Sequence, residues 1–448
     1  MGAIVGLASL LGLASRHTFS VSIWPANAVL VGTMLRQRSW SSPAGWLGAA
    51  TGFIAADVLF GRELSLACFF AFANVIGTMT ATALLARLHA EDLQLRRTHS
   101  VLRILACLLP ACLASGLAGA VLVVLEFRGS ALQTLTTWPA SELVNYLTFL
   151  PAMLTLTPHF PPGARKDGSR DAGAAALLVF SCIAAFWFDG PGSVMFPMPA
   201  LLLCALTYST QTTALVTMAL GAGCLTTLGL GVVNIGQDMS DPSMVLSIRI
   251  AVAFLVLVPL TISSAMAVRD DLLAQLRTAA DHDGLTGLLN RRAFEQRMDG
   301  QLNALSGKGR DGGFALLWLD IDHFKAINDR HGHLAGDEVL RAFASAVRSC
   351  CRSTDLAGRV GGEEFALLLS VPNPEAAGQA ADRVREAFAE RTVTWNGIPI
   401  PATVSIGAHY LDSAPGDVLK LVSHLDQALY RAKRNGRNRV EWASSLAA

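Results

Sequence analysis

The first 268 residues of this chain are a succession of apolar stretches separated by short polar loops. We count about ten stretches long enough to cross a bilayer. The whole chain is 52% hydrophobic and only 15% charged, with a mean hydropathy of +0.44. That composition is too apolar for an ordinary soluble domain. The sequence therefore predicts a multi-pass α-helical membrane domain over residues 1–268, with about ten transmembrane helices and the lipid bilayer as its partner.

The remaining residues have a different composition. Residues 269–448 carry roughly a quarter charged side chains, which is typical of one soluble globular domain. The formal net charge of the chain is +1. Because neither half has the excess of Lys and Arg that phosphate backbones attract, no nucleic-acid partner is expected.

Positive charge in the loops predicts the orientation of the membrane domain. Cations concentrate in alternate loops, on the side that the C-terminal half also shares: Arg36, Arg38, Arg87, Arg96 and Arg97. Since Lys and Arg accumulate on the cytoplasmic side of a membrane, we expect both chain ends in the cytoplasm.

Several polar side chains lie within or at the edge of these apolar stretches: Asn27, Asp57, Asn74, Glu126, Glu142 and Asn145. Such groups are costly in lipid unless they have partners. They either hold helices together by hydrogen bonds or form a pocket for a ligand or ion. The sequence leaves both interpretations open.

Some of these residues occur in short motifs that resemble a known family. Trp24-Pro25-Ala26-Asn27, Trp46, Asn74 and the pair Trp138 and Glu142 resemble the first class of bacterial membrane-associated sensor (MASE) domains. The resemblance implies a receptor in the bacterial cytoplasmic (inner) membrane for an unknown signal ligand or protein. Its candidate sensor residues are Trp24, Asn27, Asp57, Asn74, Trp138 and Glu142.

After the last apolar stretch, residues 269–282 are predicted to continue as a helix. Leu272, Leu273 and Leu276 are spaced as one helical face, and no Gly or Pro interrupts the segment. The polar run from Asp281 to Gly284 should end it. We interpret this segment as a linker that can pass a signal by a shift or rotation within a dimer, or that is only a tether.

The stretch Gly361-Gly362-Glu363-Glu364 lies between two apolar, strand-like runs. It predicts a two-residue hairpin turn in which both glycines adopt positive φ angles. The two glutamates should then point to opposite faces of a strand, so that only one faces a metal or phosphate at the turn.

Other chemical groups follow apolar runs of the same half. Asp320 and Asp322 end a predicted strand as carboxylates of the kind that hold divalent cations. Asn328 and Asp337 have the hydrogen-bonding groups to recognise a guanine edge. Lys433 and Arg437 belong to a cationic helix end that would attract phosphates. Each element alone is weak, but their order and spacing together are specific.

In that order, the motif Asp283 to Arg292, the Asp320 segment, Gly361 to Phe365, Thr403 to Gly407 and the Lys433 segment resemble the GGDEF family of diguanylate cyclases. The resemblance covers residues 278–442. It implies an α+β domain over residues 283–442, with about five mostly antiparallel strands wrapped by helices, akin to polymerase palms and nucleotide cyclases. Residues 443–448 would be a tail.

The resemblance also implies a reaction, the condensation of two GTP into cyclic di-GMP and two pyrophosphates. Two Mg²⁺ or Mn²⁺ ions per active site would be held by Asp320, the Ile321 carbonyl and Glu363. Catalysis would involve Glu363, Glu364, Asp320 and Lys325. The implied GTP site comprises Phe324, Asn328, Asp337, Gly361, Gly362, Lys433 and Arg437.

Because the product is two-fold symmetric and each protomer offers one GTP site, catalysis should require a homodimer. Arg352 and Asp355 stand at the spacing of the family's inhibitory product site, with Arg383 as an auxiliary residue. Their register implies feedback inhibition by cyclic di-GMP. Two alternatives remain: a catalytically silent nucleotide receptor, and another nucleotide cyclase or polymerase-like transferase.

Overall fold

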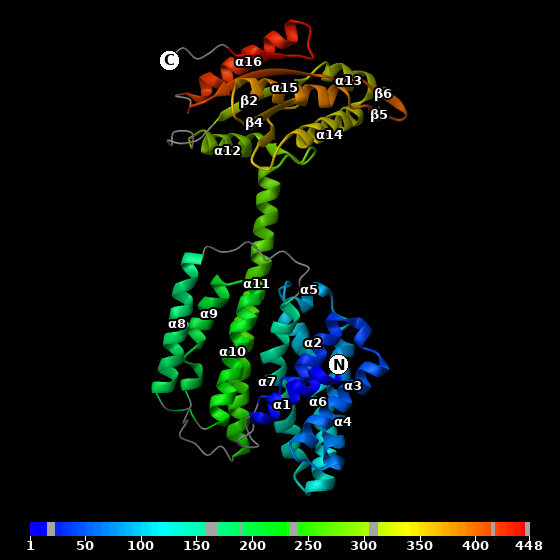
Figure 1. Cartoon of the computed structure of the whole chain (residues 1–448), viewed down its shortest axis with the longest axis vertical. Coiled ribbons are helices and arrows are strands. Elements are labelled where there is room, and N and C mark those ends of the chain that lie inside the picture. Colours follow the sequence, from blue (N-terminus) through cyan, green and yellow to red (C-terminus); the bar gives the residue numbers. More distant parts are fainter. Residues whose placement is uncertain are drawn as a thin grey trace. The chain divides into compact units, whose positions relative to one another are not determined.

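The computed structural model describes residues 1–15, 23–156, 168–188, 190, 192–230, 232, 241–303, 312–413 and 417–443. The predicted tail lies outside these residues except for Ala443. The chain divides into two compact units, Met1–Leu272 and Leu273–Ala448 (Figure 1).

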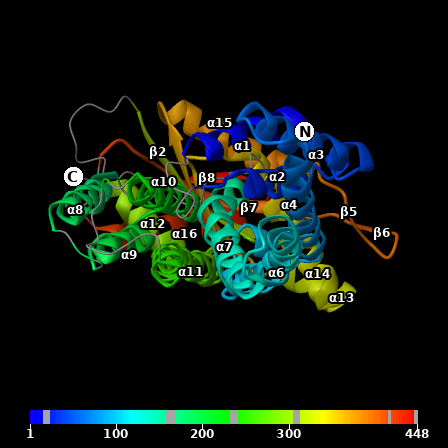
Figure 2. The same ribbon diagram turned by 90° about the horizontal axis from the view of Figure 1, so that it is seen from below.

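The first unit is helical in its described part. Its helices are α1 (Gly2–Ala14), α2 (Ala26–Arg36), α3 (Pro43–Leu59), α4 (Leu64–Leu85), α5 (Ala90–Leu93), α6 (Ser100–Phe127), α7 (Ala131–Thr155), α8 (Gly168–Trp187), α9 (Met198–Thr207), α10 (Thr210–Gly229) and α11 (Pro242–Asp281). Two short 3₁₀ helices, η1 (Arg38–Trp40) and η2 (Ser193–Met195), lie between them. Helices α4, α6 and α7 pack side by side, which Figure 2 shows nearly end-on.

Among the described helices, four are long and apolar enough to cross a membrane: α4, α6, α10 and α11. The predicted count of about ten spans stays a prediction. Helices α2 and α9 have 11 and 10 residues, so that at 1.5 Å per residue each is about 15 Å long, half of a bilayer core. Side chains such as Phe180 and Trp187 are nonetheless largely exposed on the helical surface. An apolar exterior of this kind suits a lipid environment.

Helix α11 is 40 residues long and contains both the last apolar stretch and the segment after it. Leu272, Leu273 and Leu276 remain exposed along this helix. An exposed apolar stripe at helical spacing is the kind of surface that pairs with a second helix.

The second unit is an α+β fold around a mixed sheet. Its strands are β1 (Leu289–Asn290), β2 (Gly313–Ile321), β3 (Leu356–Arg359), β4 (Glu364–Val371), β7 (Val404–Leu411) and β8 (Val440–Trp442), in the spatial order β1-β3-β4-β2-β7-β8. A separate hairpin joins β5 (Val393–Trp395) and β6 (Ile398–Ile400). The helices are α12 (Arg291–Asn303), α13 (Phe324–His331), α14 (His333–Cys350), α15 (Pro374–Ala389) and α16 (Val418–Arg434).

The predicted α+β fold is confirmed, but the sheet has six strands in the described part where we expected about five. Strands β3, β4, β2 and β7 pair antiparallel, whereas the short edge strands β1 and β8 pair parallel to their neighbours. Strand β1 has only two residues. Neither edge strand is long enough to give a clear alternation of apolar and polar residues, which explains the difference.

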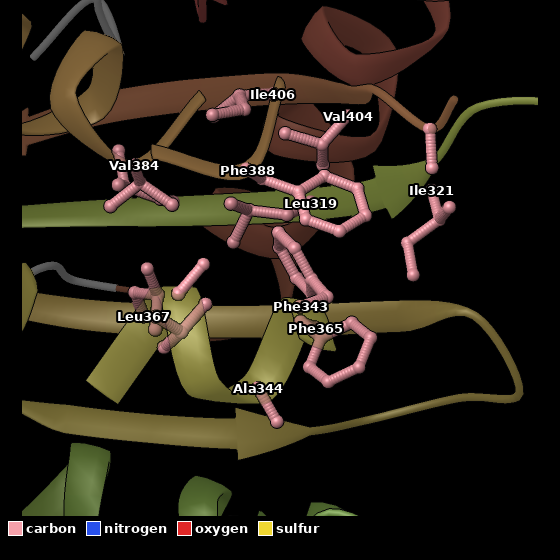
Figure 3. Close-up of a cluster of buried hydrophobic side chains, with 14 of the residues drawn as sticks. Leu319, Ile321, Phe343, Ala344, Phe365, Leu367, Val384, Phe388, Val404 and Ile406 are labelled. Carbon is pink, nitrogen blue, oxygen red and sulfur yellow. The ribbon is translucent and has the colours of Figure 1, made fainter. Parts of the chain in front are cut away.

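Every residue of the central strand β2 is buried, because helices cover both faces of the sheet. Leu317 and Leu319 point into a core with α14 and α15, while Leu316 and Trp318 point into a core with α12 and α16. Figure 3 shows part of the first core, in which the ring of Phe343 meets the rings of Phe365 and Phe388 edge to face. Because alternate side chains of β2 pack into the two cores, the end of this strand is held in place from both faces of the sheet.

Candidate functional site

Strand β2 carries Asp320 near its C-terminal end, beside β4. In the strand register, Asp320 lies opposite Glu364, the first residue of β4. The Ile321 N–H donates to the carbonyl of Glu363, at an N–O distance of 3.3 Å. The structure therefore brings together four of the predicted residues, Asp320, Ile321, Glu363 and Glu364.

The connection between β3 and β4 differs from the predicted two-residue turn. It has four residues, Val360 to Glu363, and neither Gly361 nor Gly362 has a positive φ. The prediction of positive φ was wrong. Instead, a Cβ on Gly361 would overlap the Glu364 side chain, whereas Gly362 faces open space. The first glycine thus allows a close approach and the second leaves room above the loop.

Burial and neighbouring carboxylates raise the pKa values of two acids of this site, Asp320 and Glu363. Burial raises the pKa of Asp320, and Glu364 and Asp322 add to the effect while Lys433 opposes it. Burial also raises the pKa of Glu363, followed by the charge of Asp320. Carboxylates in such an arrangement repel one another unless a cation is close.

Lys433, from the last turn of α16, supplies a cation. Its Nζ lies 2.7 Å from Oδ2 of Asp320, whose side chain is only 8% exposed. Among the described residues, no three His, Cys, Asp or Glu side chains stand together as a metal site. Two carboxylates with backbone oxygens nevertheless fit Mg²⁺, which usually completes its shell with water and substrate phosphate. The Lys433 ammonium already stands in for positive charge at Asp320.

Asp322 does not belong to the group that could hold a metal. Its Oδ1 accepts from Ser405 Oγ (2.6 Å), and its Oδ2 accepts from Thr403 Oγ1 (2.7 Å) and Asn438 N (3.0 Å). These bonds tie the end of β2 to β7 and to the loop after α16. The carboxylate that the sequence suggested as a metal ligand is thus a structural one.

Asn328 lies on α13 with its side chain against α14. Its Oδ1 is buried and has no hydrogen-bond partner in the structure. Gly336 makes room for it, because a Cβ there would overlap Asn328 Oδ1 and lie 3.2 Å from the ring of Phe324. A buried carbonyl oxygen without a donor is expensive in a folded protein. Asp337, next to Gly336, is half-buried.

The other predicted substrate residues have varied positions. The Phe324 side chain is buried in the core, so only its main chain can face a substrate. Lys325 is exposed on α13, and Arg437 is exposed in the loop after α16 with φ of +60°. No described contact joins either cation to Asp320. Gly336, which gives Asn328 its space, was missed because a glycine inside a helical pattern gives no signal of its own.

Arg359 joins the loop of the two glycines to the end of the linker helix. Its Nε and Nη2 donate to the carbonyl of Gly362, at 3.1 and 2.7 Å. Its Nη1 lies 3.1 Å from Asp283 Oδ1, which also accepts from the N–H and hydroxyl of Thr286. Asp283 begins one of the motifs that we identified in the sequence but was given no role, and Arg359 lies two residues before the Gly361 motif.

The predicted product site groups three residues around Cys351. Asp355 accepts from the N–H groups of Arg352 and Ser370, at 2.8 and 3.0 Å. Burial raises the pKa of Cys351 to about 12, with Asp355 adding to the effect and Arg383 opposing it. The Arg383 carbonyl oxygen lies 3.8 Å from Sγ of the adjacent Cys350, and the side chains of Arg352 and Arg383 are exposed.

In the first unit, five of the six candidate sensor residues meet in one hydrogen-bonded cluster. Glu142 Oε1 accepts from Asn27 Nδ2 (3.1 Å), Ser115 Oγ (2.6 Å) and Trp138 Nε1 (3.3 Å). Asn27 also donates to Asn74 Oδ1 (3.0 Å) and accepts from Trp24 Nε1 (3.3 Å). Glu142 Oε2 is buried without a hydrogen-bond partner.

Asp57, the sixth candidate, has an arginine as its described partner. It pairs with Arg62 (3.0 Å), which stacks on Phe70, whose ring in turn stacks on Trp138 at 5.8 Å between centroids. Ser115 was missed by the sequence analysis because a lone serine in an apolar helix is usually satisfied by its own backbone.

The chain is similar in sequence to known diguanylate cyclases. The family model "Diguanylate cyclase, GGDEF domain" matches residues 280–439. The chain is 33% identical to the probable diguanylate cyclase DgcF of Escherichia coli strain K12, over 68% of this chain and 96% of that protein. It is 29% identical to the probable diguanylate cyclase DgcF of Escherichia coli O157:H7, over 98% of this chain and 93% of that protein.

One similar solved structure is that of the coiled coil and GGDEF domain of DgcB from Caulobacter crescentus in complex with c-di-GMP. The alignment covers 40% of this chain and 95% of the DgcB chain, with 32% identity and a TM-score of 0.38. The match to DgcF of strain K12 and the family model identify the chain: it belongs to the GGDEF family of diguanylate cyclases. Diguanylate cyclase activity, the synthesis of cyclic di-GMP, is the activity of this protein.

The contact between Asp283 and Arg359 gives a first prediction. Burial alone would raise the pKa of Asp283, but hydrogen bonds from Thr286 and Arg359 outweigh it and lower the pKa. The stabilisation is therefore complete above the unfolded value of about 3.9 and is lost as pH falls through the lowered value. We expect Asp283→Asn to lower the free energy of unfolding by about 1–2 kcal/mol at pH 7. The difference in unfolding free energy between the variant and the parent should narrow below about pH 4.

Urea unfolding of a fragment spanning residues 273–448, which is one compact unit, measures this effect across pH. Asp299→Asn, at an exposed position of α12, is the matched control and should stay within about 0.5 kcal/mol of the parent. A difference between parent and Asp283→Asn that is the same at pH 3 and pH 7 would contradict the prediction.

Proposed function

We propose that this enzyme condenses two molecules of GTP into cyclic di-GMP and two pyrophosphates, at a site that contains Asp320, Glu363 and Asn328. The observation that carries the choice of GTP is the buried, unpartnered Oδ1 of Asn328. This oxygen can accept a hydrogen bond from a base, and the Asp337 carboxylate, on the next helix α14, can accept from N1 and N2 of guanine. An adenine edge offers no such pair of donors.

We further propose that Asp320, the Ile321 carbonyl and Glu363 hold two Mg²⁺ or Mn²⁺ ions per active site. When bound, these ions would activate the 3′-hydroxyl and stabilise charge on the transferred phosphoryl group. Glu364, opposite Asp320 in the register, supports the metal-binding carboxylates. Lys325, Lys433 and Arg437 bind the triphosphate, and Gly361 and Gly362 leave room for it.

The active form is a homodimer in this proposal. One protomer provides one GTP site, so that two sites must face each other to close a two-fold symmetric product. The exposed apolar stripe of α11 at Leu272, Leu273 and Leu276 supports pairing through the linker helix. The linker over residues 269–282 then carries the signal from the membrane domain of residues 1–268 to the catalytic domain of residues 283–442.

We place this enzyme in the bacterial inner membrane with its catalytic domain in the cytoplasm. The support is the four long apolar helices and the cations of alternate loops, since positive loops face the cytoplasm. The first unit would then be a MASE-type sensor domain whose signal is unidentified.

Gly336→Ala tests the GTP site. The added Cβ displaces Asn328 Oδ1, and the loss of its hydrogen bond to guanine should raise KM for GTP about tenfold or more. The measurement is cyclic di-GMP formation from GTP and Mg²⁺ by the purified full chain, repeated over a dilution series.

Because dimers dissociate on dilution, specific activity should fall at low enzyme concentration.

Gly378→Ala is the matched control, since a Cβ at this helical position comes no closer than 3.7 Å to another atom. It should leave KM within about twofold of the parent. If Gly336→Ala binds GTP as the parent does, the proposed guanine site is wrong. A specific activity that stays constant on dilution would contradict the dimer.

Arg352, Asp355 and Arg383 are proposed to bind cyclic di-GMP as a feedback inhibitor. Arginine side chains suit the two phosphates of the product, and Asp355 is held in place by two N–H groups. Arg352→Ala should therefore raise the product concentration needed for half inhibition about tenfold or more. Arg391→Ala, which removes an exposed arginine bonded to the Ala342 carbonyl, should keep normal inhibition. Unchanged inhibition in Arg352→Ala would refute the site.

The cluster around Glu142 is proposed to set the resting state of the sensor. Gln keeps the size of this side chain but replaces an acceptor by a donor, which disturbs its bonds with Asn27, Ser115 and Trp138. We expect Glu142→Gln to change the basal rate of cyclic di-GMP formation by the full chain in lipid nanodiscs about fivefold or more. Glu126→Gln, at an exposed acid near the end of α6, is the control. Equal rates in all three proteins would count against the sensor role.

A further inference from the structure

Lys433 holds a position that a substrate-binding cation alone would not require. Its Nζ is 2.7 Å from Asp320 Oδ2, so that the ammonium neutralises the most buried carboxylate of the proposed metal site. No other ion pair to Asp320 occurs in the part of the chain that the structure describes. The Lys433 side chain is 34% exposed, four times the exposed fraction of the Asp320 side chain. The cation thus reaches a buried acid from a partly open position.

The neighbouring cations of α16 have other partners. Arg431 Nη2 donates to the carbonyl of Trp442 at 2.7 Å, and the Arg434 guanidinium lies 5.8 Å from the centroid of the Tyr430 ring. The loop that follows is held by Asp322, which accepts from Asn438 N. These contacts anchor the end of α16 and the loop after it. Lys433, in the same turn, contacts the Asp320 carboxylate.

We propose that Lys433 is an exchangeable counter-ion: it occupies Asp320 before loading, is displaced by the divalent metal, and then binds the nucleotide's phosphates. The inference rests on the proposed metal site. A lysine ammonium is a compact charge on a flexible four-carbon stem, which suits movement between two anionic partners. The movement also avoids leaving the buried Asp320 carboxylate without an opposite charge.

Such an exchange couples the two ligands. Metal binding without nucleotide must break the contact between Lys433 and Asp320. The cost of breaking this contact weakens metal binding. Nucleotide phosphates offer Lys433 a new partner and so strengthen metal binding. By thermodynamic reciprocity, the metal strengthens nucleotide binding by the same factor. The enzyme then takes up metal and nucleotide together rather than holding metal at rest.

The test measures Mn²⁺ binding rather than activity, from the electron paramagnetic resonance signal of free Mn²⁺, on the purified full chain. Each protein is titrated without nucleotide and with the α,β-methylene analogue of GTP, which cannot release pyrophosphate. We expect Lys433→Gln to bind Mn²⁺ about tenfold more tightly than the parent without nucleotide, and to lose most of the strengthening by the analogue. Lys433→Arg, which keeps the charge, should bind Mn²⁺ without nucleotide as weakly as the parent.

Lys325→Gln is the matched control. It removes another cation of the proposed triphosphate site that forms no described ion pair with Asp320, so its Mn²⁺ affinity without nucleotide should equal that of the parent. Equal affinity in folded Lys433→Gln and parent, or an equal gain in Lys325→Gln, would overturn the inference while leaving the metal site intact. Absence of Mn²⁺ binding even with the analogue would overturn the metal site and the inference with it.

Discussion

Electrostatic repulsion among one buried and two half-buried carboxylates is the constraint on which the second unit depends. Asp320, Glu363 and Glu364 meet where β2 ends and β4 begins, and burial together with mutual repulsion raises the pKa values of Asp320 and Glu363. The fold meets part of this cost with one lysine at 2.7 Å. A site that is short of positive charge binds divalent cations well because its own charges are incompletely balanced. In the proposed metal site, the same imbalance would favour the binding of Mg²⁺ or Mn²⁺.

Much of this site was predictable from the sequence because its residues lie at fixed offsets from apolar strands. The runs before Asp320 and after Glu364 gave β2 and β4, and their pairing brings the two acids together. The glycine loop was predicted with the wrong geometry, since a close approach and a positive φ both select glycine. Asp322 was equally ambiguous: a carboxylate after a strand can bind a metal or, as here, accept hydrogen bonds from two hydroxyls and an N–H.

The helical unit was less predictable. Composition indicates apolar helices, but their ends and pairings depend on contacts between distant segments. The partnership of Asn27 with Glu142 joins residues 115 positions apart, and Ser115 joins them from a third helix. No local pattern specifies such a meeting. The polar residues were identifiable one by one, whereas the carboxylate that gathers most of them could be recognised only from the packed structure.

The double burial of β2 has a consequence for how the enzyme can change. Leu317 and Leu319 belong to one core and Leu316 and Trp318 to the other, and Asp320 follows them in the same strand. Because close-packed interiors transmit small displacements, a change of side-chain volume on either side of the sheet reaches the acid at its end. A substitution in the core face of α12 would then shift the position of Asp320. The position of the proposed metal-binding carboxylate thus depends on the packing of both cores.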